Sequence, residues 1–425
     1  MFRSPRGTQD VLPEDSHYWR FVEEQARRHA VRCGYGEIRT PTIEETALFL
    51  RGVGEGTDIV DKEIYSFKDK GDNDLALRAE GTAPVMRAFL QHNLQQQPTP
   101  VRLFSLINAF RYDRPQAGRY REFHQFNCEA IGDTDPLVDA EIVLLLWDFL
   151  NGVGLQNLTV QINSIGDKTC RPAYRKALFD YFSSQEFELC EDCRRRLATN
   201  PMRILDCKNP RCQTVIDGAP RTIDYLCPEC LEHFERVQDY LRIREVPFQI
   251  NPKLVRGLDY YTHTVFEVWP ATVGAQSALG GGGRYDGLAE QIGGPPTAGV
   301  GFATGLERVI LNLKEQGIEP PKASAVNVYF VVMDEDGRRQ ALRLATRLRG
   351  HDVAATIGTR GRSVRAQMRQ ANSLGARYAA ILGGDELQAQ QVTLRDLAKQ
   401  EERRLAYDEA VARLVDSDKA TEHCG

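Results

Sequence analysis

Several features that mark particular classes of protein are missing from this chain of 425 residues. No apolar run approaches the roughly 20 residues that a membrane-spanning helix needs, so we expect no membrane contact. The first residues, MFRSPRGTQDVLPED, are polar and lack the apolar centre of a secretory signal, which predicts a cytoplasmic protein. A net charge of −5 gives no overall basic field, although a large acidic enzyme can still present a local basic face to nucleic acid.

Cysteine is sparse outside one segment, since six of the ten cysteines lie between Cys190 and Cys230. In a cytoplasmic protein, crowding of this kind indicates a metal site or plain thiols rather than disulfides. The chain also lacks any evident internal repeat or low-complexity segment. A solenoid or a disordered protein is therefore not expected.

The length predicts two or three domains. Residues 1–320 carry strand and glycine patterns, interrupted over 167–246 by a helix-rich, charged and cysteine-bearing insertion. Paired prolines at 320 and 321 mark a linker, and residues 325–425 alternate strand and helix, which predicts a small α/β domain with a largely parallel sheet. The elements we expect include helices over 15–31 and 136–150 and strands over 75–78, 101–110, 248–250 and 264–268.

The first stretch that could carry chemistry is LALRAEGTAPVMRAF, Leu75 to Phe89. A strand ends there at Glu80-Gly81-Thr82, where a carboxylate and a hydroxyl would lie at the strand's mouth. Glu80 is suited to pairing with an ammonium group. The alternative is a capping turn, with Thr82 as the N-cap before Pro84, and the sequence leaves both open.

The second stretch, Arg102 to Gly132, reads as a hairpin with a long arginine-rich loop. Arg111 at the end of the first strand could bind a phosphate with both guanidinium nitrogens. On the second strand, Glu122, Gln125 and Glu129 are expected to point the same way, into a site that needs donors and acceptors. The alternative is a solvated, charged hairpin tip, which four arginines and three polar strand residues argue against.

The third stretch, LVRGLDYYTHTVFEV from Leu254 to Val268, introduces a strand with Arg256, Tyr260 and Tyr261. A plain strand entry needs neither a fixed cation nor two phenols. A pocket for a small polar ligand and a phosphate could use all three residues.

The fourth stretch runs from Ala278 to Leu311 and contains GGGGRYDG and AGVGFATGLERVIL. Its glycine windows are weak as dinucleotide fingerprints, because no regular strand–helix–strand unit surrounds them. The second part reads as a glycine-rich strand entering a helix, where the main chain can lie close to a ligand and Arg308 falls one turn into the helix. The alternative is glycine-permitted packing of the strand on the helix, with Arg308 in a salt bridge.

Together these stretches resemble the histidyl-tRNA synthetase family of the class II aminoacyl-tRNA synthetases. IRTPTIEETALF resembles the first signature of the class, with Pro41 at a dimer contact, while RLFSLINAFRYDRPQAGRYREFHQF resembles the second and GVGFATGLERVIL the third. LVRGLDYYTHTVFE and GGGGRYDGL resemble segments peculiar to the histidine enzyme, and RGTQDVLPED near the N-terminus also fits. The likeness covers nearly the whole chain.

The resemblance implies an α+β catalytic domain with a six-stranded antiparallel sheet flanked by helices, a helical insertion, and a C-terminal α/β anticodon-binding domain. It implies that L-histidine and ATP give histidyl-adenylate and pyrophosphate, after which histidine passes to the 3′ end of tRNA(His). A homodimer and Mg²⁺ accompanying the ATP are implied as well, with no organic cofactor, and no carboxylate is assigned to the Mg²⁺.

The resemblance also assigns residues. Arg111 matches an arginine at the α-phosphate, Arg308 one near the γ-phosphate, and Arg256 one peculiar to this family that approaches the α-phosphate and the carboxylate from the opposite side. Glu122 and Phe123 match the part that cradles ATP, with Phe123 stacking on adenine. The histidine-binding positions are Glu80, Gly81, Thr82, Gln125, Glu129, Arg256, Tyr260 and Tyr261. Candidates for contact with tRNA are Arg114, Arg119 and Arg121.

The cysteine segment contains two Cys-X2-Cys pairs, Cys190 with Cys193 and Cys227 with Cys230. This spacing is typical of a structural zinc site. The helical surroundings do not resemble zinc knuckles, the family that the chain resembles is not generally described as a zinc enzyme, and buried cysteine is a common small apolar residue. Zinc at these four cysteines is therefore not favoured, and we assign no metal ligand.

Three other functions were weighed. A regulatory subunit of histidine biosynthesis built on the synthetase core would usually lack the anticodon-binding domain and the RGLDYYT segment, and this chain has both. A sensor of uncharged tRNA would be expected beside a kinase domain, which is absent. A nucleotide-dependent oxidoreductase would need a strand–helix alternation around Gly281 that the sequence does not show.

Overall fold

The computed structural model divides the chain into two compact units, Met1–Pro320 and Pro321–Gly425. The structure describes residues 2–53, 62–113, 118–256, 260–270, 278–321, 326–359 and 361–422. Each unit has its own sheet and its own hydrophobic core. Among the described residues, no helix is both long and apolar enough to cross a membrane.

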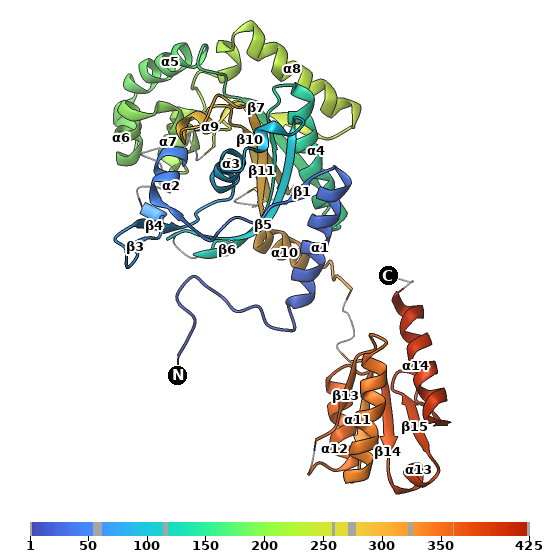
Figure 1. Ribbon diagram of the computed structural model, residues 1–425. Coiled ribbons are helices and arrows are strands. Elements are labelled where there is room, and N and C mark those ends of the chain that lie inside the picture. Colours follow the sequence, from blue (N-terminus) through green and yellow to red (C-terminus); the bar gives the residue numbers. More distant parts are fainter. Residues whose placement is uncertain are drawn as a thin grey trace. The chain divides into compact units, whose positions relative to one another are not determined.

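The first unit is built on a mixed sheet of eight strands (Figure 1). They are β1 (Gly36–Glu37), β5 (Val101–Phe110), β6 (Glu122–Ile131), β7 (Leu158–Ser164), β8 (Phe248–Ile250), β9 (Thr262–Pro270), β10 (Gly280–Arg284) and β11 (Gly299–Gly305). The order in the sheet is β1-β5-β6-β11-β10-β9-β7-β8. The six strands from β5 to β7 pair antiparallel, which confirms the expected six-stranded sheet. The edge strands β1 and β8 pair parallel and extend it.

Four helices pack on one face of this sheet: α1 (Ser16–Arg32), α4 (Pro136–Gly152), α8 (Pro228–Ile243) and α10 (Leu306–Glu315). In α1 the expected apolar face is confirmed, since Val22, Ala26 and Ala30 are fully buried. They join a core that includes Phe126 of β6 and Phe149 of α4. Asp135 caps α4 by accepting a hydrogen bond from the backbone N–H of Leu137, 2.8 Å away.

Near the other face lie shorter elements. A three-stranded sheet in the order β2-β4-β3 contains β2 (Ile43–Glu45), β3 (Ser66–Lys68) and β4 (Asp74–Leu77), and the neighbouring helices are α2 (Thr46–Val53), α3 (Thr82–Gln91) and α9 (Leu288–Gln291). Helix α3 packs against β6, α2 and α9. The turn that leads into α3 therefore lies at the surface of the large sheet, where it can contribute to a site.

Between β7 and β8 the regular elements are all helices or 3-10 turns (Figure 1, green). It contains α5 (Arg171–Ser183), α6 (Glu191–Thr199), α7 (Pro210–Ile216) and α8, with 3-10 turns η3 (Glu186–Glu188), η4 (Pro201–Asp206) and η5 (Thr222–Tyr225). Apart from α5 and α8 these elements are short. Their apolar residues join a second core that also contains Tyr260 and Tyr261.

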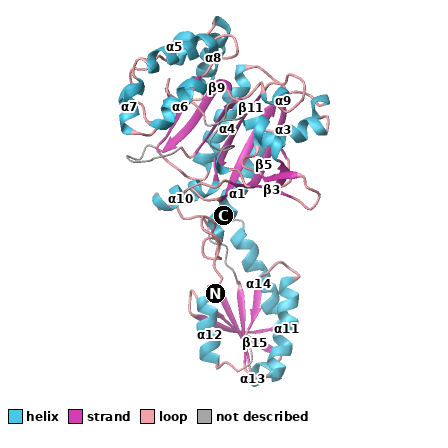
Figure 2. Ribbon diagram, turned by 90° about the vertical axis from the view of Figure 1, so that its left-hand side faces the viewer, coloured by secondary structure: helices cyan, strands magenta, loops and turns pink. Residues whose placement is uncertain are grey.

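The second unit holds a five-stranded sheet in the order β13-β12-β14-β15-β16. Its strands are β12 (Val328–Val332), β13 (Ala355–Ile357), β14 (Tyr378–Leu382), β15 (Gln391–Asp396) and β16 (Glu401–Ala406). Strand β12 pairs parallel with β13 and β14, whereas β15 and β16 are antiparallel additions, so the expectation of a largely parallel sheet is only half right. The helices are α11 (Glu335–Arg349), α12 (Val364–Ser373), α13 (Gly384–Gln388) and α14 (Tyr407–Glu422). Figure 2 shows α11 and α12 on opposite faces of this sheet.

Candidate active site

A cavity of about 670 Å³ lies over the large sheet of the first unit. Strands β6, β9, β10 and β11 contribute to its wall, together with α10, the β5–β6 hairpin and the helical segment between β7 and β8. It brings together the following site residues expected from the sequence: Glu80, Thr82, Arg111, Arg119, Phe123, Gln125, Arg256, Tyr260, Tyr261 and Arg308. Residues far apart in the chain thus share one cavity.

Three arginines are fixed around this cavity by different parts of the chain. Arg111 follows β5 and donates from Nε to the carbonyl oxygen of Ala79, 2.9 Å away. Arg308 in α10 donates from Nε to the carbonyl of Gly118 at 3.1 Å and from Nη1 to that of Ala278 at 2.9 Å. Because these partners are neutral carbonyls, none of these hydrogen bonds neutralises the positive charge of a guanidinium group.

Arg256 is held differently, by an ion pair with Glu267 of β9. The indole Nε1 of Trp269 donates to the same carboxylate at 3.1 Å, which fixes its orientation. Burial alone would lower the pKa of Arg256, but Glu267 beside it raises that pKa above its ordinary value. Arg256 therefore stays charged at the cavity wall.

The arginines influence one another's charge. The pKa of Arg308 is lowered, first by burial and then by the positive charges of Arg119 and Arg111. Burial likewise lowers the pKa of Arg111, against the opposing effect of nearby Glu63 and Glu80. Like charges held together in a partly buried cavity are costly unless an anion joins them. This part of the cavity is thus suited to a polyanion.

Beside the arginines lies a buried slot, formed by Glu80, Thr82 and Tyr285 of the cavity wall and by Glu129, which is in contact with that wall but not part of it. Glu129 of β6 accepts hydrogen bonds from the hydroxyl groups of Thr82, at 2.8 Å, and Tyr285, at 2.5 Å. Burial raises the pKa of Glu129 to about 8, an effect that the two hydroxyl donors oppose. Burial also raises the pKa of Glu80. Because burial makes the charged forms of both carboxyl groups costly, the slot favours a ligand that carries positive charge or donates hydrogen bonds.

Glu80 also caps helix α3. Its carboxylate accepts hydrogen bonds from the backbone N–H groups of Thr82 and Ala83, each at 2.7 Å. The helix begins at Thr82 with Gly81 as its N-cap, so the alternative in which Thr82 is the N-cap is wrong. A Cβ on Gly81 would lie 2.9 Å from Nδ2 of Asn127, which explains the glycine there. Capping and lining of the cavity are therefore combined in one turn.

Two buried polar atoms of cavity-lining residues have no hydrogen-bond partner within the described part of the chain. They are Oε1 of Gln125 and Nε of Arg256. A buried acceptor or donor without a partner costs on the order of 1–3 kcal/mol. Because both residues face the cavity, a bound ligand could satisfy them.

Three tyrosines surround the slot and are almost fully buried: Tyr260, Tyr261 and Tyr285. The rings of Tyr260 and Tyr261 lie 4.7 Å apart between centroids, and Tyr285 meets Tyr260 edge-on at 5.8 Å. Burial raises the pKa of each well-shielded phenol, so all three remain protonated hydrogen-bond donors at neutral pH. They provide aromatic walls for a flat ligand.

The arginines of the hairpin tip are less uniform than expected. Arg119 lines the cavity and pairs with Asp113 at 3.3 Å, while its side chain remains half exposed. The guanidinium of Arg121 instead stacks on Tyr112, with its Cζ 3.8 Å from the ring centroid. Arg114 lies outside the described residues.

The expectation that Glu122 points the same way as Gln125 and Glu129 is wrong. Position 125 is three residues after position 122, and side chains alternate along a strand, so the two side chains point to opposite faces. Glu122 accepts a hydrogen bond from Asn108 at 3.3 Å and is not part of the cavity wall. Glu307, the neighbour of Arg308 in the chain, does not form a salt bridge with it. The Glu307 carboxylate instead accepts a hydrogen bond from the backbone N–H of His124, 2.9 Å away.

Several residues of the site were not predicted. Glu267, Trp269 and Tyr285 line the cavity: Glu267 pairs with Arg256, Trp269 donates to Glu267, and Tyr285 donates to Glu129. The helical segment contributes Arg196, Arg203, Lys208 and Gln213. A signal existed for Glu267, because a carboxylate within an apolar strand indicates a buried partner. No signal existed for the helical segment, whose approach to the sheet depends on tertiary packing.

The zinc site that the sequence did not favour, with both Cys-X2-Cys pairs in one set of ligands, is not formed. The two Cys-X2-Cys pairs belong to separate clusters, one formed by Cys190, Cys193, Cys207 and Cys212, the other by Asp167, Cys170, Cys227 and Cys230. Within each cluster the potential ligand atoms lie within 4.8 Å of one another. Cys207 and Cys212, which lie between the two pairs, complete the first cluster, whereas Asp167 and Cys170, which precede both pairs, complete the second.

The antiparallel sheet carries convergent arginines beside a buried slot with carboxylates. This arrangement is typical of a class of protein that binds a phosphate-bearing ligand next to a small polar molecule. Comparison with known proteins makes this more specific. Residues 7–309 match the family model for histidyl-tRNA synthetase, and residues 326–417 match that for an anticodon binding domain.

Whole-chain relatives agree. A histidine–tRNA ligase of Dehalococcoides mccartyi is 50% identical over 97% of this chain and 99% of its own length, and one of Pelotomaculum thermopropionicum is 50% identical over 95% of each chain. The crystal structure of apo S. aureus histidyl-tRNA synthetase is 38% identical, covers 98% of this chain and 100% of its own, and superposes with a TM-score of 0.83. The chain belongs to the histidyl-tRNA synthetase family.

A more distant structure shares the fold alone. It is an ATP phosphoribosyltransferase regulatory subunit/histidyl-tRNA synthetase from Bacillus halodurans, 23% identical with a TM-score of 0.64. It covers 88% of this chain and 96% of its own length.

Proposed function

We infer that this chain is a histidine–tRNA ligase. It activates L-histidine with ATP to give histidyl-adenylate and pyrophosphate, and then transfers histidine to the 3′ end of tRNA(His). The observation that carries this inference is the shared cavity, in which Arg111, Arg256 and Arg308 adjoin the Glu129 slot.

The arginines account for the first step. Attack of the histidine carboxylate on the α-phosphorus builds negative charge on phosphate oxygens, and fixed cations stabilise that charge without reorganising. We assign Arg111 and Arg256 to the α-phosphate from opposite sides, and Arg308 to the γ-phosphate. Arg256 can also bind the carboxylate of histidine, because its Nε has no partner in the described part of the protein.

The slot accounts for the choice of amino acid. Glu80 with Gly81 and Thr82, at the start of α3, is assigned to the ammonium side of histidine. Gln125 and Glu129 supply acceptors deeper in the slot, and Tyr260 and Tyr261 enclose the imidazole ring. A flat ring with two nitrogen atoms can use both the aromatic walls and the polar floor.

ATP is expected to bind with its adenine on Phe123, whose ring lies 5.5 Å from Cζ of Arg111. Glu122 begins the same strand, and its part in ATP binding stays a prediction. Mg²⁺ accompanies ATP in this family and neutralises phosphate charge. The described residues gather no three carboxylates around one point in the cavity, so we assign no ligand of this chain to Mg²⁺.

Transfer to tRNA requires the rest of the chain. We assign residues 1–320 to the class II catalytic core, 167–246 to its helical insertion and 325–425 to reading of the anticodon, consistent with the family model over 326–417. Of the described hairpin arginines, Arg119 is better placed than Arg121 to contact the acceptor stem, since it lines the cavity and is half exposed. Arg114 and Arg121 remain candidates of the same kind.

We further propose a homodimer and a cytoplasmic location. The segment around Pro41 supports the dimer because it resembles the first signature of the class, which lies at a dimer contact. Sedimentation of the purified protein tests this, with a dimer expected and a monomer at micromolar concentration as the contradicting result. The substrates of the reaction are used in the cytoplasm, which supports the location.

A regulatory role in histidine biosynthesis is the second candidate, because one protein with this fold is described as an ATP phosphoribosyltransferase regulatory subunit/histidyl-tRNA synthetase. Both features that such subunits usually lack are present here: the RGLDYYT segment and the C-terminal unit. We therefore favour the ligase.

The substrate is tested most directly by a thermal-shift panel of the twenty amino acids in the presence of ATP. A ligand that binds only the folded state raises the melting temperature. We expect histidine alone to stabilise the protein beyond the effect of ATP. Equal shifts with several amino acids would contradict the assignment of the slot.

A further inference from the structure

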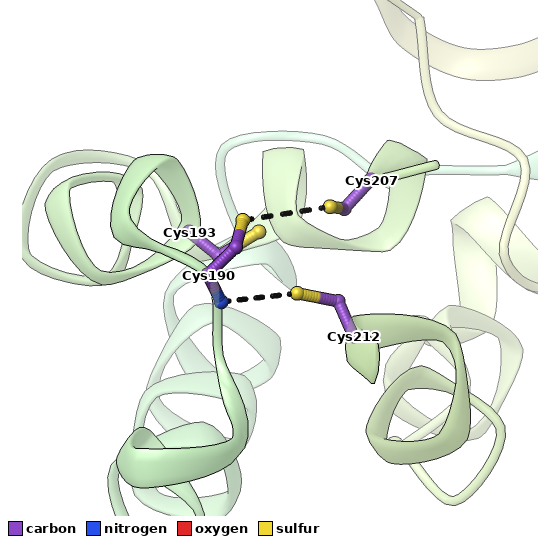
Figure 3. A group of neighbouring side chains, drawn as sticks. All are labelled: Cys190, Cys193, Cys207 and Cys212. Atoms are coloured by element: carbon purple, nitrogen blue, oxygen red, sulfur yellow. Dashed lines mark hydrogen bonds between the residues drawn. The ribbon is translucent and has the colours of Figure 1, made fainter. Parts of the chain in front are cut away.

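One cluster of side chains plays no part in the reaction described above. Cys190 precedes α6, Cys193 lies in its first turn, Cys207 follows η4 directly, and Cys212 lies in α7. Figure 3 shows the four side chains turned toward one another from these three elements. Cys193 and Cys212 are completely buried and Cys207 is 8% exposed.

The distances between the sulfur atoms fit a metal ion rather than a disulfide. All four Sγ atoms lie within 4.8 Å of one another, and those of Cys190 and Cys207 are 3.8 Å apart. Four thiolates at about 2.3 Å from a tetrahedral zinc lie about 3.8 Å from each other. A disulfide would need about 2.05 Å.

Main-chain donors point at two of these sulfur atoms. The backbone N–H of Cys190 donates to Sγ of Cys212 at 3.2 Å, and that of Asn209 donates to Sγ of Cys207 at 3.5 Å. Such bonds suit thiolates, which are strong acceptors, and orient sulfur ligands around a metal. Thiols that packed only as apolar side chains would not need them.

We propose that Cys190, Cys193, Cys207 and Cys212 bind one structural zinc ion. Thiolate ligands in a tetrahedral set select zinc among the common divalent ions. The role is structural because four protein ligands leave no open position for water or substrate. The spacing Cys-X2-Cys followed by Cys-X4-Cys falls within the usual range for such sites.

The physical need for the ion lies in the shortness of the elements. Helices α6 and α7 have nine and seven residues, and η4 has six, so none of them would be stable alone. Their apolar residues pack into a shared core, and a metal cross-link adds folding free energy to that packing.

The zinc site would also shape the active site, and this part of the inference rests on the proposed function. Arg203, Lys208 and Gln213 line the cavity, and Cys207 and Cys212 directly precede two of them. The ion would thus fix one wall of the cavity without contacting the substrates.

The second cluster differs and is not included in the proposal. It has three cysteines and Asp167, whose Oδ1 already accepts hydrogen bonds from the backbone N–H groups of Thr169 and Cys170, at 2.8 and 3.1 Å. The test must therefore measure the loss of zinc that is specific to the four-cysteine cluster.

The first experiment measures zinc per chain in the full-length protein, purified under reducing conditions without chelators or metal-affinity resin. We expect Cys212→Ser to lower the zinc content by one equivalent relative to the unmodified chain. Cys33→Ser removes an exposed cysteine outside both clusters and should leave the content unchanged. Absence of zinc from the unmodified protein, or an unchanged content in Cys212→Ser, would overturn the proposal.

A second measurement needs no variant and covers the case in which Cys212→Ser does not fold. Cysteine alkylation is mapped by mass spectrometry on the unmodified protein before and after treatment with a zinc chelator. We expect the four cysteines to become reactive together after chelation, while Cys128, buried in β6 away from the cluster, stays protected. Reactivity of the four that does not respond to the chelator would exclude a bound ion.

Discussion

At the scale of single residues, Glu129 connects the fold of the site with its chemistry. Its carboxylate is buried and bound by the hydroxyl groups of Thr82 and Tyr285, two residues that line the cavity. A Cβ on Gly301 of the neighbouring strand would lie 1.8 Å from Oε2 of Glu129, so the glycine makes room for this side chain. Burial of the carboxylate therefore depends on the glycine of β11 as well as on the position of Glu129 in β6.

The raised pKa of Glu129 gives a testable dependence of stability on pH. The folded-state pKa is about 8, above the ordinary value of 4.5, so the folded protein retains a proton that the unfolded chain releases. The resulting stabilisation is complete below pH 4.5 and is lost as the pH rises through 8. At about 1.4 kcal/mol per pKa unit, its upper value is roughly 5 kcal/mol.

The comparison uses Glu129→Gln, which keeps the shape of the side chain but cannot ionise. Urea unfolding at pH 5.5 and pH 8.5 gives the free energy of unfolding of both proteins. We expect the unmodified protein to lose stability relative to Glu129→Gln between these values. Parallel pH profiles for the two proteins would show that Glu129 does not titrate in this range.

At the scale of elements, the glycines of β10 explain how the sheet is closed beneath the cavity. Strand β10 pairs antiparallel with β9 on one side and β11 on the other, so these glycines do not form a dinucleotide-binding loop. A Cβ on Gly282 would lie 1.9 Å from the carbonyl oxygen of Gly301. The main chain cannot move aside there without disturbing the central strands.

We therefore expect Gly282→Ala to destabilise the first unit by about 1–3 kcal/mol or more, as overpacking does. Gly305→Ala is the matched control, because no atom lies within 4 Å of its added Cβ. The free energy of unfolding is measured for both variants by denaturant titration. Equal stability of the two would mean that close packing at β10 is not required.

The elements also show what the sequence can and cannot predict. The apolar run over 101–110 predicts β5 with its bounds, and the alternation over 264–268 lies within β9. Strand β16, with the sequence EERRLA, was missed because five of its six residues are exposed and give no apolar alternation. The spacing of Cys190 with Cys193 and of Cys207 with Cys212 is visible in the sequence, but the meeting of these two pairs is not, since it depends on tertiary contacts between α6, η4 and α7.

For the site, sequence reasoning worked where a residue's chemistry was out of place for its element. Arg256 and the two tyrosines before β9 were such residues, and all three line the cavity. It failed for Glu122, because the prediction placed positions 122 and 125 on the same face although side chains alternate along a strand. Tyr285 was overlooked because a tyrosine after a glycine run is equally typical of a core.

At the scale of the whole molecule, the chain consists of two units with separate cores. The core of the second unit contains residues of β12, β14, α11 and α14 and includes none from the first unit. A chain ending at Pro320 retains both cores of the first unit and all the described residues of the cavity. The truncated chain should therefore fold.

We expect this truncated chain to catalyse histidine-dependent ATP–pyrophosphate exchange at close to the full-length rate, because that reaction needs only the cavity. Charging of tRNA(His) should fall at least tenfold in kcat/KM, owing to lost contacts with the anticodon. Both rates are measured on the same preparations. Normal charging by the truncated chain would assign the second unit another task.

The central claim is that arginines from separate parts of the chain act on one phosphate beside the slot, and Arg256→Ala tests it most directly. Histidine-dependent ATP–pyrophosphate exchange is measured at saturating histidine and ATP, with Arg244→Ala as the control, since Arg244 is exposed and paired with Asp148 outside the cavity. We expect a loss of at least about 100-fold for Arg256→Ala, with an unchanged far-ultraviolet circular dichroism spectrum, and no loss for the control. Exchange at the rate of the unmodified protein in Arg256→Ala would contradict the account.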